Sequence, residues 1–124
     1  MQLTDEQFDQ LITRAMDELP QEYITGLQNV VIVQADEPTP EQLEKMKIDQ
    51  NHLLLGLYEG IPLTQRGSGF SGMLPDKITL FKHPILKVVG NDDELLEQIK
   101  RTLWHEIAHY YGLNHSHIDA LEQR

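Results

Sequence analysis

Three histidines and a glutamate near the C-terminal end have types and spacing that could bind a metal and hydrolyse an amide. The segment from His105 to His115 fits the pattern H-E-x-x-H-x-x-G-x-x-H. Residues four apart share one face of a helix, so His105 and His109 can each direct a ring nitrogen at the same ion. Gly112 can end the helix in the left-handed conformation, which turns the chain and brings in His115 as a third ligand. Three protein ligands leave a fourth tetrahedral position for water, as in catalytic zinc sites.

Glu106 has a role that a purely structural zinc site would not need. Zinc lowers the pKa of a bound water to about 7. Glu106, one position round the helix from His105, can accept the proton of that water as a general base and pass it to a leaving nitrogen. His117 could replace His115 or join it, but the motif spacing favours His115. We therefore predict Zn2+ bound by His105, His109 and His115, with Glu106 as the catalytic residue.

Other polar side chains are weaker candidates. A carboxylate often orients a zinc-bound imidazole, and Asp119 or Glu122 could do so, although plain surface acids are the simpler interpretation. Tyr110 and Tyr111 fit helix packing better than stabilisation of an oxyanion. Two further histidines have no partner at ligand spacing and are interpreted as structural or surface residues: His52 and His83.

Length, charge and composition narrow the class of protein. The 124 residues predict a single domain over 1–124. The net charge of -10 repels nucleic-acid phosphates and anionic lipids, so we expect neither nucleic acid nor membrane as a partner. There is no cysteine, which excludes disulfides and thiolate metal sites. The N-terminal residues do not resemble a signal peptide, and no apolar run approaches the roughly 20 residues of a membrane span. We therefore expect a cytoplasmic location.

The elements that must position the motif can be predicted from capping residues and periodicity. A capping box at Thr4–Gln7 begins an amphipathic helix that Pro20 ends. Asn91 caps the long helix that carries the motif, and three acidic residues fill its first turn. This order predicts an α+β fold with a small sheet packed against helices. Three strands are also predicted: 30–33, buried on both faces, 53–58, and 78–81, the last extending towards His83 and ended by Pro84. The remaining predicted elements are a short helix after Thr39 with Leu43 and Met46 facing inward, a loop over 60–76 and a helical turn at 118–121.

The chain resembles the small bacterial minimal-zincin family of zinc metallopeptidases. The resemblance is carried by Leu19-Pro20 and by the segments 54–64, 74–82 and 105–109. It implies a small mixed sheet packed against an active-site helix and an N-terminal helix, with an edge strand above the metal. Residues 78–81 look like that edge strand, which would bind an extended peptide by strand addition. Two features differ from related patterns: no Met-turn follows His115, and the family often has aspartate at this third-ligand position.

The favoured function is a zinc-dependent hydrolase that cleaves peptide bonds, with a peptide or protein as its substrate. The alternative is a non-catalytic module in which zinc stabilises a surface for a protein partner. The small size of the chain motivates this alternative, because only short strands and loops can build substrate pockets.

Overall fold

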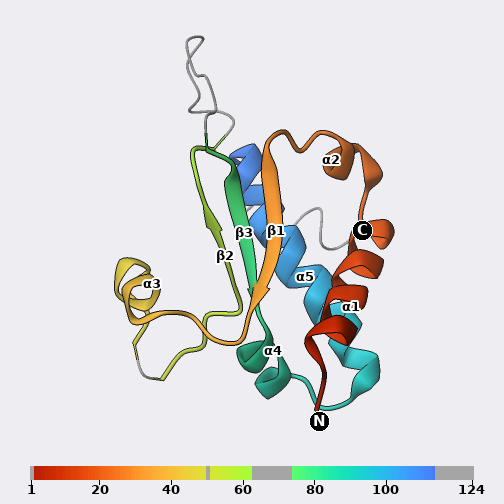
Figure 1. The fold of residues 1–124 in the computed structure, drawn as a ribbon, viewed down its shortest axis with the longest axis vertical. Helices are drawn as coiled ribbons and strands as arrows, with labels where there is room; N and C mark the ends of the chain where they lie inside the picture. The colour runs from red at the N-terminus through yellow and green to blue at the C-terminus, as the bar shows by residue number, and fades with distance from the viewer. Residues whose placement is uncertain (1, 50, 63–73, 114–124) are drawn as a thin grey trace.

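The computed structural model describes residues 2–49, 51–62 and 74–113 and confirms the predicted α+β class. Five helices and a three-stranded mixed sheet are present in these ranges (Figure 1). Among the helices in these ranges, a candidate membrane span is not found. In chain order the elements are α1 (Asp5–Glu18), α2 (Gln21–Thr25), β1 (Val30–Ala35), α3 (Pro40–Lys45), β2 (Gly56–Glu59), β3 (Asp76–Phe81), α4 (Lys82–Val88) and α5 (Asp92–Tyr111).

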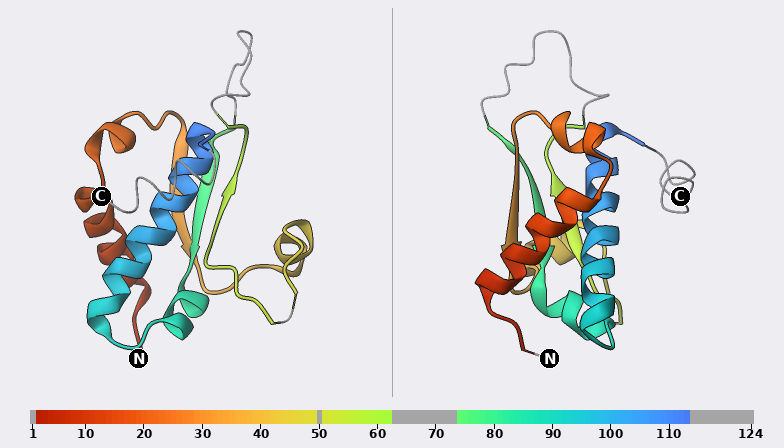
Figure 2. Two further views of the ribbon diagram at one scale, coloured as in Figure 1. Left: turned by 180° about the vertical axis from the view of Figure 1, so that it is seen from behind. Right: turned by 90° about the vertical axis from the view of Figure 1, so that its right-hand side faces the viewer.

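The sheet and the helices form two layers. The strand order is β1-β3-β2, with β1 parallel and β2 antiparallel to β3. Helix α5 crosses one face of this sheet, and α1 packs along α5 (Figures 1 and 2). The core lies between the sheet and these two helices, and it is made of Phe8, Ile12, Ala15, Ile78, Leu80, Ile85, Leu95, Ile99, Leu103, Trp104 and Ile107.

Local hydrogen bonds confirm the predicted helix starts. The Gln7 backbone N–H donates to the Thr4 hydroxyl (3.1 Å), and the Thr4 N–H donates to the Gln7 side-chain oxygen (2.9 Å). The Asn91 side-chain oxygen accepts from the Glu94 N–H (3.0 Å) at the start of α5. Gly112 has a φ of 74°, the left-handed conformation predicted for the end of the motif helix. The motif helix therefore has defined ends.

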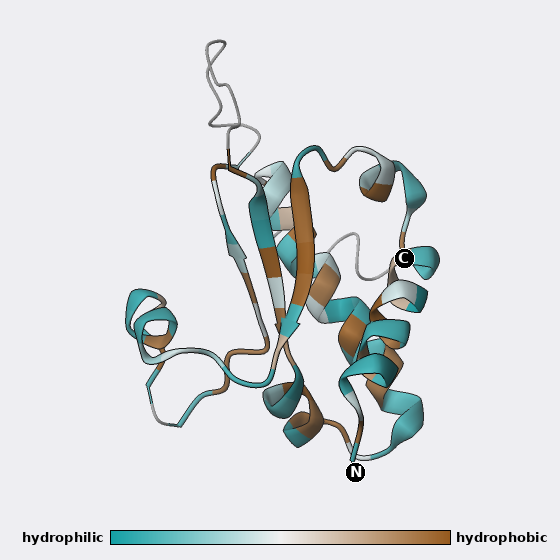
Figure 3. Cartoon of the chain, in the orientation of Figure 1, coloured by the Kyte–Doolittle hydropathy of each residue, from teal (hydrophilic) through white to brown (hydrophobic). Residues whose placement is uncertain are grey.

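The strand at 30–33 was predicted to be buried on both faces, and this is wrong. Val31 and Val33 are 42% and 37% exposed. The reason is that α1 and α5 pack on one face of the sheet (Figure 2), whereas alternate side chains of β1, including these two valines, point to the other face. Figure 3 shows β1 in the hydrophobic colour over most of its length, so hydropathy alone did not distinguish its two faces.

The edge strand was assigned to 78–81, and this is also wrong. Strand β3 is central, since β1 pairs along one side and β2 along the other. Ile78, Thr79, Leu80 and Phe81 are all buried, as expected of a strand with neighbours on both sides. In the described part of the chain the two outer strands are β1 and β2, and of these β2 is the one that lies against the Glu106 segment of α5.

Two helices were not predicted, and two elements differ in extent or packing. Helix α2 follows Pro20, and α4 begins directly after β3, where Pro84 lies in its first turn and breaks no helical hydrogen bond. Residues 78–81 therefore continue into a helix rather than extending as strand to His83. Strand β2 starts at Gly56 rather than at residue 53. Helix α3 lies beyond β2, away from the other helices, and buries no residue; Met46 is 41% exposed (Figures 1 and 2).

Candidate metal centre

Helix α5 brings two of the predicted zinc ligands together. The ring centroids of His105 and His109 are 4.8 Å apart, and the ring planes meet at 68°. This is the pairing expected for residues one turn apart on a single helix face. The His109 side chain is 38% exposed, so its ring can be reached from solvent.

The third predicted ligand lies outside the described residues. His115 and its alternative His117 both fall there, together with Asp119, Glu122 and the predicted turn at 118–121. Over the described ranges, no group of three or more His, Cys, Asp or Glu side chains is arranged to hold a metal. The three-histidine ligand set therefore stays a prediction.

Glu106 is buried beside the histidine pair. Its side chain is 9% exposed, and Oε1 lies 3.2 Å from Nδ1 of His109. The hydrogen bond to Glu106 raises the pKa of His109, burial opposes this, and the negative charge of Glu106 adds to the increase. A carboxylate in this position favours a proton on Nδ1 and leaves Nε2 as the metal-binding nitrogen. The neighbouring imidazoles and the carboxylate therefore fit a zinc ion, whose usual ligands are histidine nitrogens.

The strand beneath Glu106 contributes a residue that sequence reasoning missed. A Cβ atom built on Gly56, the first residue of β2, would lie 3.3 Å from Cγ of Glu106 and 2.7 Å from Cγ2 of Thr102. Strand β2 thus lies directly against the motif helix at its glutamate. A glycine inside an apolar strand pattern often marks such a close approach, and this was the available signal.

Both tyrosines that follow His109 in the motif serve packing, as predicted. Tyr110 is fully buried, and its hydroxyl accepts from the Gln28 N–H (3.1 Å). The Tyr111 hydroxyl donates to the Tyr23 carbonyl (2.7 Å). Their hydroxyls thus tie the end of α5 to α2 and to the segment after it.

The remaining histidines lie apart from the motif, as predicted. His52 is in an exposed turn, with Nδ1 2.7 Å from Oδ1 of Asp49. His83 is about half exposed on α4 and faces Asp36 (4.0 Å) and Glu37 (3.6 Å). These surroundings support surface roles for both.

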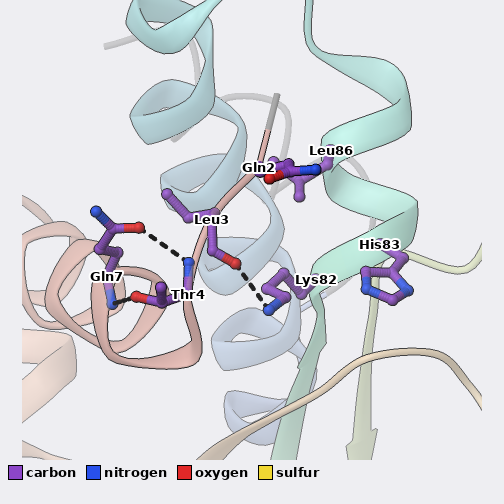
Figure 4. Close-up of a pocket in the computed structure, with 7 residues that line it drawn as sticks. All are labelled: Gln2, Leu3, Thr4, Gln7, Lys82, His83 and Leu86. Atoms are coloured by element: carbon purple, nitrogen blue, oxygen red, sulfur yellow. Dashed lines mark hydrogen bonds between the residues drawn. The ribbon is translucent and has the colours of Figure 1, made fainter.

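A pocket lies far from the motif, between the N-terminal segment and α4. Figure 4 shows Lys82 at its wall, where Nζ donates to the Leu3 carbonyl (2.9 Å). The same amino group donates to Oδ1 of Asp5 (2.7 Å). The buried Lys82 amino group is therefore already paired, and its hydrogen bonds hold the N-terminal segment against α4. Its charge is not available to a ligand in this pocket. Its lining residues are Gln2, Leu3, Thr4, Gln7, Lys82, His83 and Leu86.

Comparison with known proteins identifies the family of this chain. The sequence profile of a family described as zincin-like metallopeptidases matches residues 27–124. Among solved structures, the chain is similar to a conserved hypothetical protein from Thermus thermophilus, at 26% identity and a TM-score of 0.57. That similarity covers 98% of this chain and 99% of the other. A search of curated proteins finds no match. Since the profile spans most of the sequence, including the motif helix, the chain belongs to the zincin-like metallopeptidase family.

Proposed function

We propose that this protein is a zinc-dependent peptidase in which His105, His109 and His115 bind the metal and Glu106 is the general base. The observation that carries the proposal is the buried Glu106 carboxylate held against His109, one turn of helix from His105. The carboxylate of a glutamate on the solvent-facing side of a helix would instead be exposed to water. Membership of a metallopeptidase family supports the same conclusion independently.

The residues divide the chemistry between them. When bound, a zinc ion acidifies a water and polarises the carbonyl group of a substrate. The two imidazoles supply neutral nitrogen ligands from a rigid helix. Glu106 is shielded between α5 and β2, where a carboxylate interacts strongly with nearby charge. It accepts a proton from the attacking water and donates it to the leaving nitrogen, a role that contributes about 10²–10⁴-fold in rate.

The outer edge of β2, which has no neighbouring strand within residues 2–49, 51–62 and 74–113, supports an extended peptide as the substrate. The Phe81 N–H donates to the Leu55 carbonyl (2.9 Å), which directs the hydrogen-bonding groups of Leu55 towards β3. Because these directions alternate along an antiparallel strand, the next residue, Gly56, presents its backbone groups to the side away from β3. A peptide could pair there by strand addition, beside Glu106. This corrects our assignment of the peptide-binding strand from 78–81 to 56–59.

Metal analysis and a peptide-library assay test the proposal. We expect one zinc per chain after metal stripping and reloading, and cleavage of a mixed peptide library detected by mass spectrometry. Glu106→Gln should keep zinc and lose about 10²–10⁴-fold in cleavage rate, since the amide cannot accept the proton. His109→Ala should lose the metal.

A matched control separates chemistry from charge. Glu97→Gln makes the same charge change on α5 at a side chain that is 67% exposed, and it should leave cleavage unchanged. Full activity in Glu106→Gln would refute the role of the glutamate. Stoichiometric zinc without cleavage of any library peptide would favour the non-catalytic module instead.

A further inference from the structure

We propose that Gly56 is a positioning residue that sets the distance between the edge strand β2 and Glu106. The inference rests on the proposed function, because it assigns the strand that would hold a peptide beside the general base. Its structural basis is that the backbone of β2 lies on α5 at a point where no side chain fits. The nearest atoms to a Cβ at residue 56 would be Cγ2 of Thr102 (2.7 Å), Cγ of Glu106 (3.3 Å) and Cδ2 of Leu80 (3.3 Å).

The space at Gly56, rather than its backbone conformation, requires glycine. The described glycines with positive φ are Gly60 and Gly112, so alanine at position 56 meets no backbone strain. The obstacle is Thr102, which is buried and β-branched, and its hydroxyl accepts from Nε2 of Gln98 (3.0 Å). This side chain cannot turn away without losing a hydrogen bond.

Alanine at position 56 should therefore move the strand. Carbon atoms pack at about 3.5–4.0 Å, so the 2.7 Å separation must grow by about 0.8 Å. The backbone of Gly56 would move with β2, away from Glu106. A displacement on the order of 1 Å can cost about a hundredfold in rate.

The test is a pair of substitutions with an internal rescue. Gly56→Ala should lower kcat/KM for a cleaved library peptide about tenfold to a hundredfold, with zinc content unchanged. Thr102→Ser removes only Cγ2 and keeps the hydroxyl that Gln98 uses. The double variant Gly56→Ala/Thr102→Ser should recover most of the activity, while Thr102→Ser alone should resemble the wild type.

Controls distinguish positioning from loss of stability. Gly90→Ala introduces a methyl group at a site with only ordinary contacts, at 3.4 Å or more. Ile12→Val weakens the core under α1, far from β2, and at temperatures well below its melting point it should keep full kcat/KM. A similar loss of activity in Ile12→Val, or no rescue by Thr102→Ser, would overturn the proposal.

A second measurement does not depend on hydrolysis. Nuclear Overhauser contacts between the α-proton of residue 56 and the γ-protons of Glu106, measured in the metal-free protein, report the strand–helix distance directly. They should weaken in Gly56→Ala and return in the double variant. If the wild type cleaves no peptide, the proposed function fails, whereas unchanged contacts in Gly56→Ala would refute the positioning role itself.

Discussion

The contact between Glu106 and His109 should control how zinc binding depends on pH. A histidine must be neutral to bind zinc, so metal and proton compete for it. Because Glu106 raises the pKa of His109, the proton is held to higher pH than on an ordinary histidine. Below that pKa, the apparent zinc affinity should rise at least about tenfold per pH unit, one factor of ten for each proton displaced.

Glu106→Gln should change both the pH dependence of the apparent zinc affinity and its value at high pH. Without the carboxylate, the pKa of His109 falls, and the rise in affinity levels off at lower pH. The variant also loses a negative charge near the metal, which weakens binding at high pH, where no proton competes. The ratio of wild-type to variant affinity should therefore be smallest at low pH and largest above the pKa of His109.

Competition against a chelator of known affinity, between about pH 5.5 and 8.5, spans the ordinary histidine pKa of about 6.5 and measures this ratio. Glu97→Gln is the control, because it removes the same charge from an exposed site on the same helix. Its curve should run parallel to that of the wild type. If the Glu106→Gln curve is parallel too, the 3.2 Å contact does not hold the proton on His109 and this reasoning is wrong.

Three further outcomes concern stability of the metal-free protein, measured by urea unfolding with a chelator present. The contact with Glu106 that raises the pKa of His109 should stabilise the fold fully below about pH 6.5, where His109 is protonated in both states. This contribution should be lost as pH rises through the raised pKa, and Glu106→Gln should make the free energy of unfolding less dependent on pH in this range. Tyr58→Phe removes the hydroxyl that donates to the buried carboxylate of Asp76, and should cost about 1.5–3 kcal/mol. Thr4→Ala removes the capping box of α1 and should cost about 1 kcal/mol, whereas Thr4→Ser should cost less.

Features that depend on neighbours in sequence were predictable, whereas those that depend on strand order were not. Thr4, Asn91 and Gly112 satisfy groups within a few residues of themselves, so their positions alone indicate where α1 and α5 begin and end. The pairing of His105 with His109 follows from helix geometry in the same way. The α+β class followed from the order of these elements.

The two misassigned strands show what local patterns omit. Both 30–33 and 78–81 are largely apolar runs, but among the three described strands only β3 has a strand on each side. A run of apolar residues is compatible with either place, because hydropathy does not say which neighbours pair. The polar Glu59 at the end of β2, which is only partly buried, was a better sign of a sheet edge. The contact at Gly56 depends on the same pairing, so the glycine could signal a close approach but not that Glu106 is its partner.

The burial of Glu106 follows from its position around the axis of α5. Ile99, Leu103 and Ile107 are fully buried and attach one side of the helix to the core. Each residue turns the helix by about 100°, so Glu106 cannot share the face of His105. It lies one turn after Thr102, on the side where β2 approaches most closely. The histidine pair requires only a helix. The Glu106 carboxylate, in contrast, is shielded from water because β2 covers it, and β2 can approach this closely because residue 56 is a glycine.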